Sequence, residues 1–83
     1  MLIVDMAKAH IIISGMVQGV GFRYFIRAHL KRLGLTGWAE NSANEKVEAY
    51  AEGEKEKIVE LIKECKKGPM LAEVRGVGVE WLP

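Results

Sequence analysis

The sequence is poor in cysteine and contains no long hydrophobic run. Its single cysteine, Cys65, cannot form a disulfide within the chain, so no disulfide framework holds the fold. No stretch approaches the roughly 18 apolar residues of a membrane-spanning helix. The apolar run within residues 1–5 is too short for a signal peptide and lacks a basic flank. We therefore expect a cytoplasmic protein without a membrane partner.

A large charge of either sign is also missing. The 12 Lys and Arg residues nearly balance the 11 Asp and Glu residues, giving a formal net charge of +1. This balance does not support a broad nucleic-acid-binding surface. The chain does have 49% apolar residues, which is typical of a globular domain. Its length allows one domain, so we expect a single domain over residues 1–83, with 1–5 as an N-terminal extension.

Hydrophobic periodicity predicts six regular elements. The β-branched run 11–13 lacks a polar face and indicates a central strand. Apolar residues recur at helical spacing after Phe22 and after Glu54, and they alternate at strand spacing after Lys46 and Leu71. The expected elements are strand 7–14, helix 22–33, strand 36–41, strand 46–52, helix 54–67 and strand 71–81.

This order, β-α-β-β-α-β, is typical of the α+β class. Because crossover connections are right-handed, both helices should cover the same face of one antiparallel sheet. The expected architecture is therefore a ferredoxin-like sandwich, or split βαβ fold. Many unrelated functions occur on this fold, so the fold alone predicts no activity.

The loop between the first strand and the first helix contains Gly15, Gly19 and Gly21. Glycines let successive backbone N–H groups converge, and the following helix adds unpaired N–H groups and the positive end of its dipole. Such a loop favours phosphate, and Arg23 in the first helical turn can bind two phosphate oxygens. From spacing alone, a tight turn with a solvated arginine remains the alternative.

The common nucleotide-binding patterns do not fit this loop. No Gly-Lys-Ser/Thr follows it, and its glycines lack the G-x-G-x-x-G spacing. A bare phosphoryl group is therefore a better expectation than a nucleotide.

Two sequence blocks resemble the signatures of the acylphosphatase family. The run Val17-Gln18-Gly19-Val20-Gly21-Phe22-Arg23 resembles the phosphate-binding signature of that family. The run Gly37-Trp38-Ala39-Glu40-Asn41 resembles its second signature. The resemblance extends from Met6 to Trp81, which is nearly the whole chain.

The resemblance implies a hydrolase that converts small-molecule acyl phosphates to a carboxylate and inorganic phosphate, with no metal or cofactor. It implies that Arg23 and Asn41 are catalytic: Arg23 binds the phosphoryl oxygens and Asn41 positions the attacking water. It also implies that loop 15–22 holds the phosphate through the backbone N–H groups of Gln18, Gly19, Val20, Gly21 and Phe22. The alternative is a non-catalytic phosphate-binding or interaction module of the same fold.

The sequence departs from the family pattern in two places. Family members commonly have an Asp-Gly type turn where this chain has Ala43-Asn44-Glu45, and Glu45 tolerates positive φ poorly. Family members also usually continue beyond the position of Pro83 into one more short strand. We expect a monomer, with a dimer through an open sheet edge as the alternative. Residues 1–5 are a candidate to cover such an edge.

The remaining chemistry-bearing residues are expected to be structural. His10 and His29 lack partners at metal-ligand spacing, and Cys65 lies on the apolar face of the second predicted helix. The three residues Trp38, Tyr50 and Trp81 are expected to pack rather than to form a stacking platform, with Trp38 buried. The predicted open face of the sheet is acidic, which argues against an RNA partner.

Overall fold

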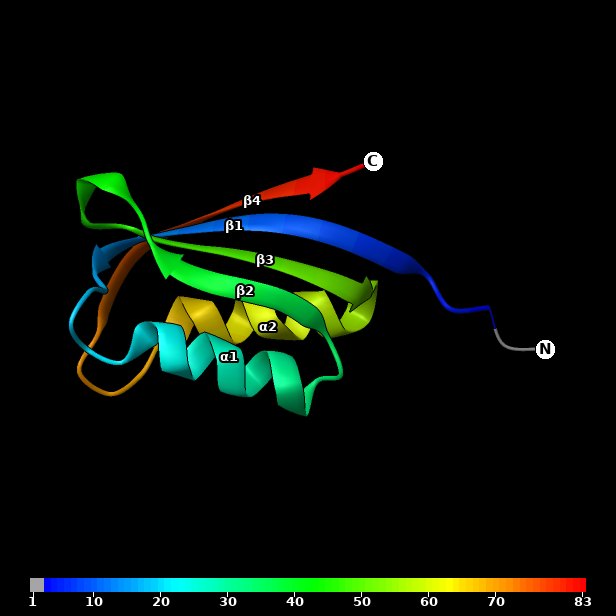
Figure 1. The fold of residues 1–83 in the computed structure, drawn as a ribbon, viewed down its shortest axis with the longest axis horizontal. Coiled ribbons are helices and arrows are strands. Elements are labelled where there is room, and N and C mark those ends of the chain that lie inside the picture. The colour runs from blue at the N-terminus through cyan, green and yellow to red at the C-terminus, as the bar shows by residue number, and fades with distance from the viewer. Residues whose placement is uncertain (1–2) are drawn as a thin grey trace.

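A four-stranded antiparallel sheet with two helices on one face forms the computed structural model, which describes residues 3–83 (Figure 1). The elements are β1 (Met6–Met16), α1 (Phe22–Arg32), β2 (Thr36–Asn41), a short 3-10 turn (Ala43–Glu45), β3 (Val47–Glu54), α2 (Lys55–Lys67) and β4 (Glu73–Leu82). The predicted ferredoxin-like β-α-β-β-α-β fold is thereby confirmed.

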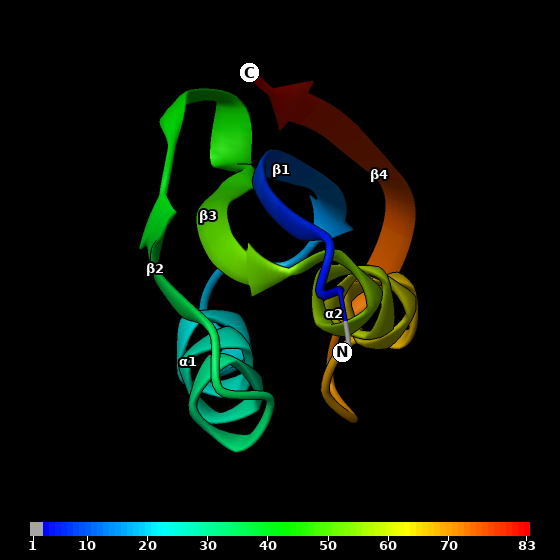
Figure 2. The same cartoon turned by 90° about the vertical axis from the view of Figure 1, so that its right-hand side faces the viewer.

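The strand order in the sheet is β2-β3-β1-β4, and every neighbouring pair is antiparallel. The predicted central strand is indeed central, since β1 pairs with β3 on one side and β4 on the other. Both helices lie against the same face of the twisted sheet (Figure 2). This arrangement brings the start of α1 close to the ends of β1 and β2, where the candidate site lies.

The core lies between the sheet and the two helices. Alternate residues of β1 point toward the helices and are fully buried, namely Ala9, Ile11 and Ile13. The apolar stripe of α2 packs against them and includes Cys65, whose predicted role as a core residue is confirmed. Burial raises the pKa of the Cys65 thiol to about 12, with the nearby Glu64 charge adding to the shift. The thiol is therefore protonated and unreactive at neutral pH.

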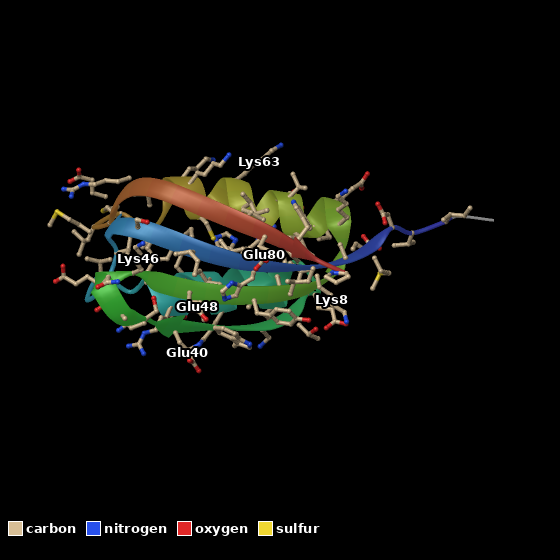
Figure 3. The ribbon with its side chains drawn as sticks, turned by 90° about the horizontal axis from the view of Figure 1, so that it is seen from above. Lys8, Glu40, Lys46, Glu48, Lys63 and Glu80 are labelled. Atoms are coloured by element: carbon tan, nitrogen blue, oxygen red, sulfur yellow. The ribbon has the colours of Figure 1, made fainter. Side chains whose placement is uncertain are left out.

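The other face of the sheet is open, and Trp38 lies on it, so the prediction that Trp38 is buried was wrong. Its side chain is 39% exposed and stacks on Tyr50 with ring centroids 6.3 Å apart. The reason is the alternation of β2, in which the neighbouring Ala39 takes the core-facing position and is fully buried. Acidic residues share this open face, including Glu40, Glu48 and Glu80 (Figure 3).

The turn between β2 and β3 contains the two residues that the sequence marked as unusual. Asn44 and Glu45 both adopt φ of 62°, in the left-handed region. The backbone N–H of Ser42 donates to the Lys46 carbonyl oxygen at 2.8 Å and closes the turn. The predicted antiparallel hairpin therefore forms, although Glu45 adopts a backbone conformation that is unfavourable for residues with a Cβ atom.

The described part of the N-terminal extension does not cover a sheet edge of its own subunit. Ile3 is 92% exposed, and the chain leads away from the sheet at this end (Figure 1). The carbonyl of Asp5 accepts a hydrogen bond from the backbone N–H of Lys55 at 2.8 Å, next to the central pair β1 and β3. Residues 1 and 2, which belong to the same prediction, lie outside the described residues. Neither described helix is long and apolar enough to cross a membrane.

Candidate active site

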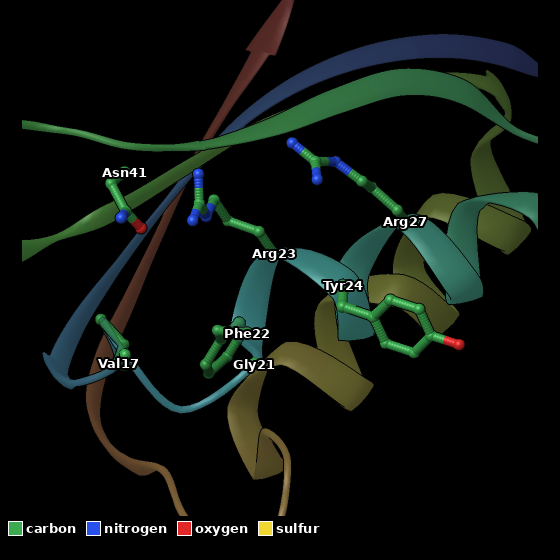
Figure 4. A pocket seen from close by; sticks show the side chains of 8 residues that line it. Val17, Gly21, Phe22, Arg23, Tyr24, Arg27 and Asn41 are labelled. Atoms are coloured by element: carbon green, nitrogen blue, oxygen red, sulfur yellow. The ribbon is translucent and has the colours of Figure 1, made fainter.

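A cavity of about 230 Å³ opens where the loop after β1, the start of α1 and the end of β2 meet (Figure 4). This volume suits a phosphoryl group with a small substituent rather than a large cofactor. The residues that line it are Val17, Gly19, Gly21, Phe22, Arg23, Tyr24, Arg27 and Asn41. All of them come from one stretch of the chain, between positions 17 and 41.

The loop that forms the floor of this cavity is anchored at both ends by buried side chains. Val17 and Phe22 are each 1% exposed, so both ends of the loop are held in the core. Gly21 caps α1 with φ of 80°, a left-handed conformation that glycine adopts without steric cost. Among the described residues, the backbone N–H groups of 18–22 form no hydrogen bond with another backbone group. These donors are therefore available to an anion.

Arg23 lies in the first turn of α1, directly beside these N–H groups. A cation at this end of a helix is opposed by the helix dipole, and no acidic residue in the first turn compensates for it. Its side chain is exposed and forms no hydrogen bond or ion pair with another residue of 3–83. An unpaired guanidinium next to unpaired N–H groups is well suited to bind a tetrahedral oxyanion.

Asn41 is the last residue of β2 and reaches the cavity from the sheet. The side chains of Asn41 and Arg23 point toward one another across the cavity (Figure 4). An amide both donates and accepts hydrogen bonds and does not titrate. The site therefore combines a group that can orient a water molecule with groups that can bind a phosphoryl anion.

The structure brings five of the seven sequence-predicted site residues together in the cavity: Gly19, Gly21, Phe22, Arg23 and Asn41. The side chains of the other two residues lie elsewhere. Val20 packs partly buried against the core. The side-chain amide of Gln18 donates to the carbonyl oxygens of Ser42 at 3.1 Å and Lys46 at 2.8 Å. The Gln18 side chain thus joins the loop to the β2–β3 turn, while its predicted backbone role stays a prediction.

The model of the acylphosphatase family matches residues 9–83, almost the entire chain. The chain belongs to the acylphosphatase family. An acylphosphatase of Anaeromyxobacter sp. (strain Fw109-5) is 47% identical over 77 residues, which cover 93% of this chain and 83% of that one. The family assignment therefore rests on the full extent of the domain rather than on the loop signature alone.

Solved acylphosphatase structures also resemble this chain in three dimensions. The structure from Coxiella burnetii has a TM-score of 0.90 and 37% identity, covering 95% of this chain and 83% of that chain. The structure from Bacillus subtilis has a TM-score of 0.89 and 33% identity, covering 92% of this chain and 84% of that chain. The acylphosphatase fold is thus retained over the whole described domain.

Sequence reasoning missed two side chains that line the cavity of this acylphosphatase-family chain, Tyr24 and Arg27. The Nη2 of Arg27 donates to the carbonyl oxygen of Ala39 at 2.8 Å. The sequence did contain a signal for Arg27, because it follows Arg23 by four residues and so lies on the same helix face. Residues 3–83 contain no group of three or more His, Cys, Asp or Glu side chains that could hold a metal ion.

Proposed function

We propose that this chain hydrolyses acyl phosphates, with the phosphoryl group bound by loop 15–22 and Arg23 and the water positioned by Asn41. The observation that carries the proposal is the convergence of three features in one cavity. These are the free N–H groups of the loop residues that line it (19, 21 and 22), the unpaired guanidinium of Arg23 and the amide of Asn41. Membership of the acylphosphatase family supports the same reaction.

Binding of the phosphoryl group uses the positive end of α1. The backbone N–H groups of Gln18, Gly19, Val20, Gly21 and Phe22 donate to the phosphoryl oxygens, and the Arg23 guanidinium donates to two of them. These donors are fixed before the substrate arrives, because buried Val17 and Phe22 hold the loop. Fixed donors stabilise the charge that builds on the equatorial oxygens in the transition state.

Hydrolysis then needs little beyond correct placement of water. The Asn41 amide accepts a hydrogen bond from a water molecule and directs its oxygen toward phosphorus, in line with the bond to the acyl oxygen. A new P–O bond forms, the P–O bond to the acyl oxygen breaks, and its electron pair leaves with the carboxylate. The proton of the water passes to a phosphoryl oxygen, so the products are carboxylate and inorganic phosphate. A carboxylate is a good leaving group, which removes the need for a strong general base.

A benzoyl phosphate assay in buffer containing a chelator tests this function directly. We expect equal amounts of benzoate and phosphate to be released, with inorganic phosphate acting as a competitive inhibitor. Phosphate binding measured by calorimetry without any turnover would identify the non-catalytic module instead. Absence of both binding and turnover would reject the anion site itself.

We also propose that the protein is a cytoplasmic monomer acting on a small-molecule acyl phosphate. The single, buried Cys65 suits a reducing compartment, because it needs no disulfide partner. The edge strand β4 has only one paired neighbour in the described sheet, so a dimer through this edge is the alternative. Sedimentation analysis distinguishes the two states.

Replacing Gln18 with leucine should lower kcat by about tenfold and reduce stability by about 1–2 kcal/mol, because two carbonyl oxygens lose their donor. The β2–β3 turn, which carries these carbonyls, follows Asn41 directly. If the turn becomes less rigid, the side-chain amide of Asn41 should move away from the position in which it orients the water. Benzoyl phosphate kinetics and urea unfolding measure the two effects. Lys46→Gln, which changes a side chain at the same turn but keeps both carbonyls, is the matched control. If Gln18→Leu loses stability but keeps full kcat, the Gln18 link does not position Asn41.

A further inference from the structure

The cavity contains a second guanidinium that binding of a single phosphoryl group does not use. Arg27 lies one helical turn after Arg23, about 6 Å farther along the helix axis, and lines the same cavity. Its hydrogen bond to the Ala39 carbonyl oxygen, at 2.8 Å, fixes the guanidinium against β2. A guanidinium has five N–H donors, so the remaining donors are available at the cavity.

The two arginines are arranged at a cost to the stability of the helix. Like charges four residues apart repel each other, and no acidic residue lies in the first turn to offset them. Within residues 3–83, neither guanidinium forms an ion pair, and no carboxylate lines the cavity. The chain as a whole is almost neutral, so this pocket concentrates positive charge locally. Such a concentration favours a ligand whose negative charge extends beyond one phosphoryl group.

Arg27 lies on the side of the cavity where the proposed mechanism places the leaving group. In Figure 4 the Arg23 guanidinium lies between Asn41 and Arg27. Ala39, to which Arg27 is bound, precedes Asn41 by two residues, or about 7 Å along β2. In an in-line displacement, water and leaving group occupy opposite sides of phosphorus. If Asn41 holds the water, the acyl group extends toward Arg27.

We propose that Arg27 determines specificity by binding a carboxylate on the acyl part of the substrate. The preferred substrates are then acyl phosphates derived from dicarboxylic acids, whose second carboxylate lies a few atoms from the anhydride. The planar guanidinium matches a carboxylate in shape and hydrogen-bonding geometry. This inference rests on the proposed function, because it assigns the acyl side of the same site.

A pair of rigid substrates tests the proposal: benzoyl phosphate and 4-carboxybenzoyl phosphate, which differ by one carboxylate. The measured quantity is kcat/KM for 4-carboxybenzoyl phosphate divided by kcat/KM for benzoyl phosphate. This ratio is determined for the wild-type protein and for Arg27→Gln. We expect Arg27→Gln to lower this ratio about tenfold, the size of one charge-assisted hydrogen bond at an open site. Lys31→Gln is the matched control, since it removes the same charge from the same helix outside the cavity and should leave the ratio unchanged.

A merely structural role for Arg27 predicts a different result. If Arg27→Gln lowers kcat/KM equally for both substrates, the residue only holds α1 to β2 and the proposal is wrong. The salt dependence of the wild-type ratio gives a test that needs no variant, because raising NaCl from 0.05 to 0.5 M should lower a ratio that depends on charge attraction. A ratio that does not respond to salt also overturns the proposal. Failure of the wild type to hydrolyse benzoyl phosphate would instead reject the proposed function.

Discussion

Replacing Arg23 with alanine should lower kcat/KM for benzoyl phosphate by about 100- to 1,000-fold, which corresponds to about 3–4 kcal/mol of lost transition-state stabilisation. The guanidinium makes no hydrogen bond or ion pair with the other described residues, so its loss leaves no group of residues 3–83 unpaired. The fold should therefore survive, and the loss should fall on the bound phosphoryl group. Steady-state kinetics, together with inhibition by inorganic phosphate, measures both effects.

Arg32→Ala is a suitable control for the Arg23 variant. Arg32 is the last residue of α1, and its Nη2 lies 3.1 Å from Nδ1 of His29, away from the cavity. We expect this variant to keep wild-type kinetics and phosphate inhibition. Arg23→Lys should recover part of the activity, because it restores the charge but not the paired donors. Full activity of Arg23→Ala would remove Arg23 from the mechanism.

Replacing Asn41 with alanine should lower kcat by about 100-fold while the inhibition constant of phosphate changes less than about twofold. In the proposed mechanism Asn41 acts on the attacking water, so its loss removes an interaction made in the transition state rather than in the ground state. Single-turnover kinetics with benzoyl phosphate separates this chemical step from binding. Retention of full kcat would show that another group orients the water.

Asn41→Asp provides a matched comparison, because it keeps the size of the side chain but adds a negative charge beside the phosphate site. A carboxylate at this position should weaken phosphate binding, which alanine should not do. Weaker phosphate inhibition in Asn41→Asp but not in Asn41→Ala would place the Asn41 side chain next to the anion. Equal effects would contradict that placement.

The sequence allowed the fold and the glycine-containing loop between β1 and α1 to be predicted because their signals are local. The glycines, the apolar stripes of both helices and the position of Arg23 all depend on neighbours within a few residues. The orientation of Trp38 depends instead on which strand takes the edge of the sheet and on which residue faces the core. Ala39 takes that core-facing position, and the larger Trp38 therefore lies on the open face.

The long-range contacts of the site could not be predicted from local signals. The link from Gln18 to the β2–β3 turn joins residues 24 and 28 positions apart, and the link from Arg27 to Ala39 joins residues 12 positions apart. Each depends on how a helix or loop docks against the sheet, which side-chain spacing does not specify. The presence of Asn41 at the end of a strand was predictable, whereas its approach to Arg23 required the assembled sheet.

Every residue that lines the cavity precedes the β2–β3 turn. The second half of the chain, through α2 and β4, supplies Ile58, Leu61 and Cys65 to the core and none of the cavity wall. Gly68 of this half lies against the ring of Phe22 and so supports the loop only through packing. Substitutions in the second half should therefore affect the cavity only through packing. Substitutions at the residues that line the cavity should instead change its chemistry directly, so stability and reactivity can be tuned at separate residues of this small domain.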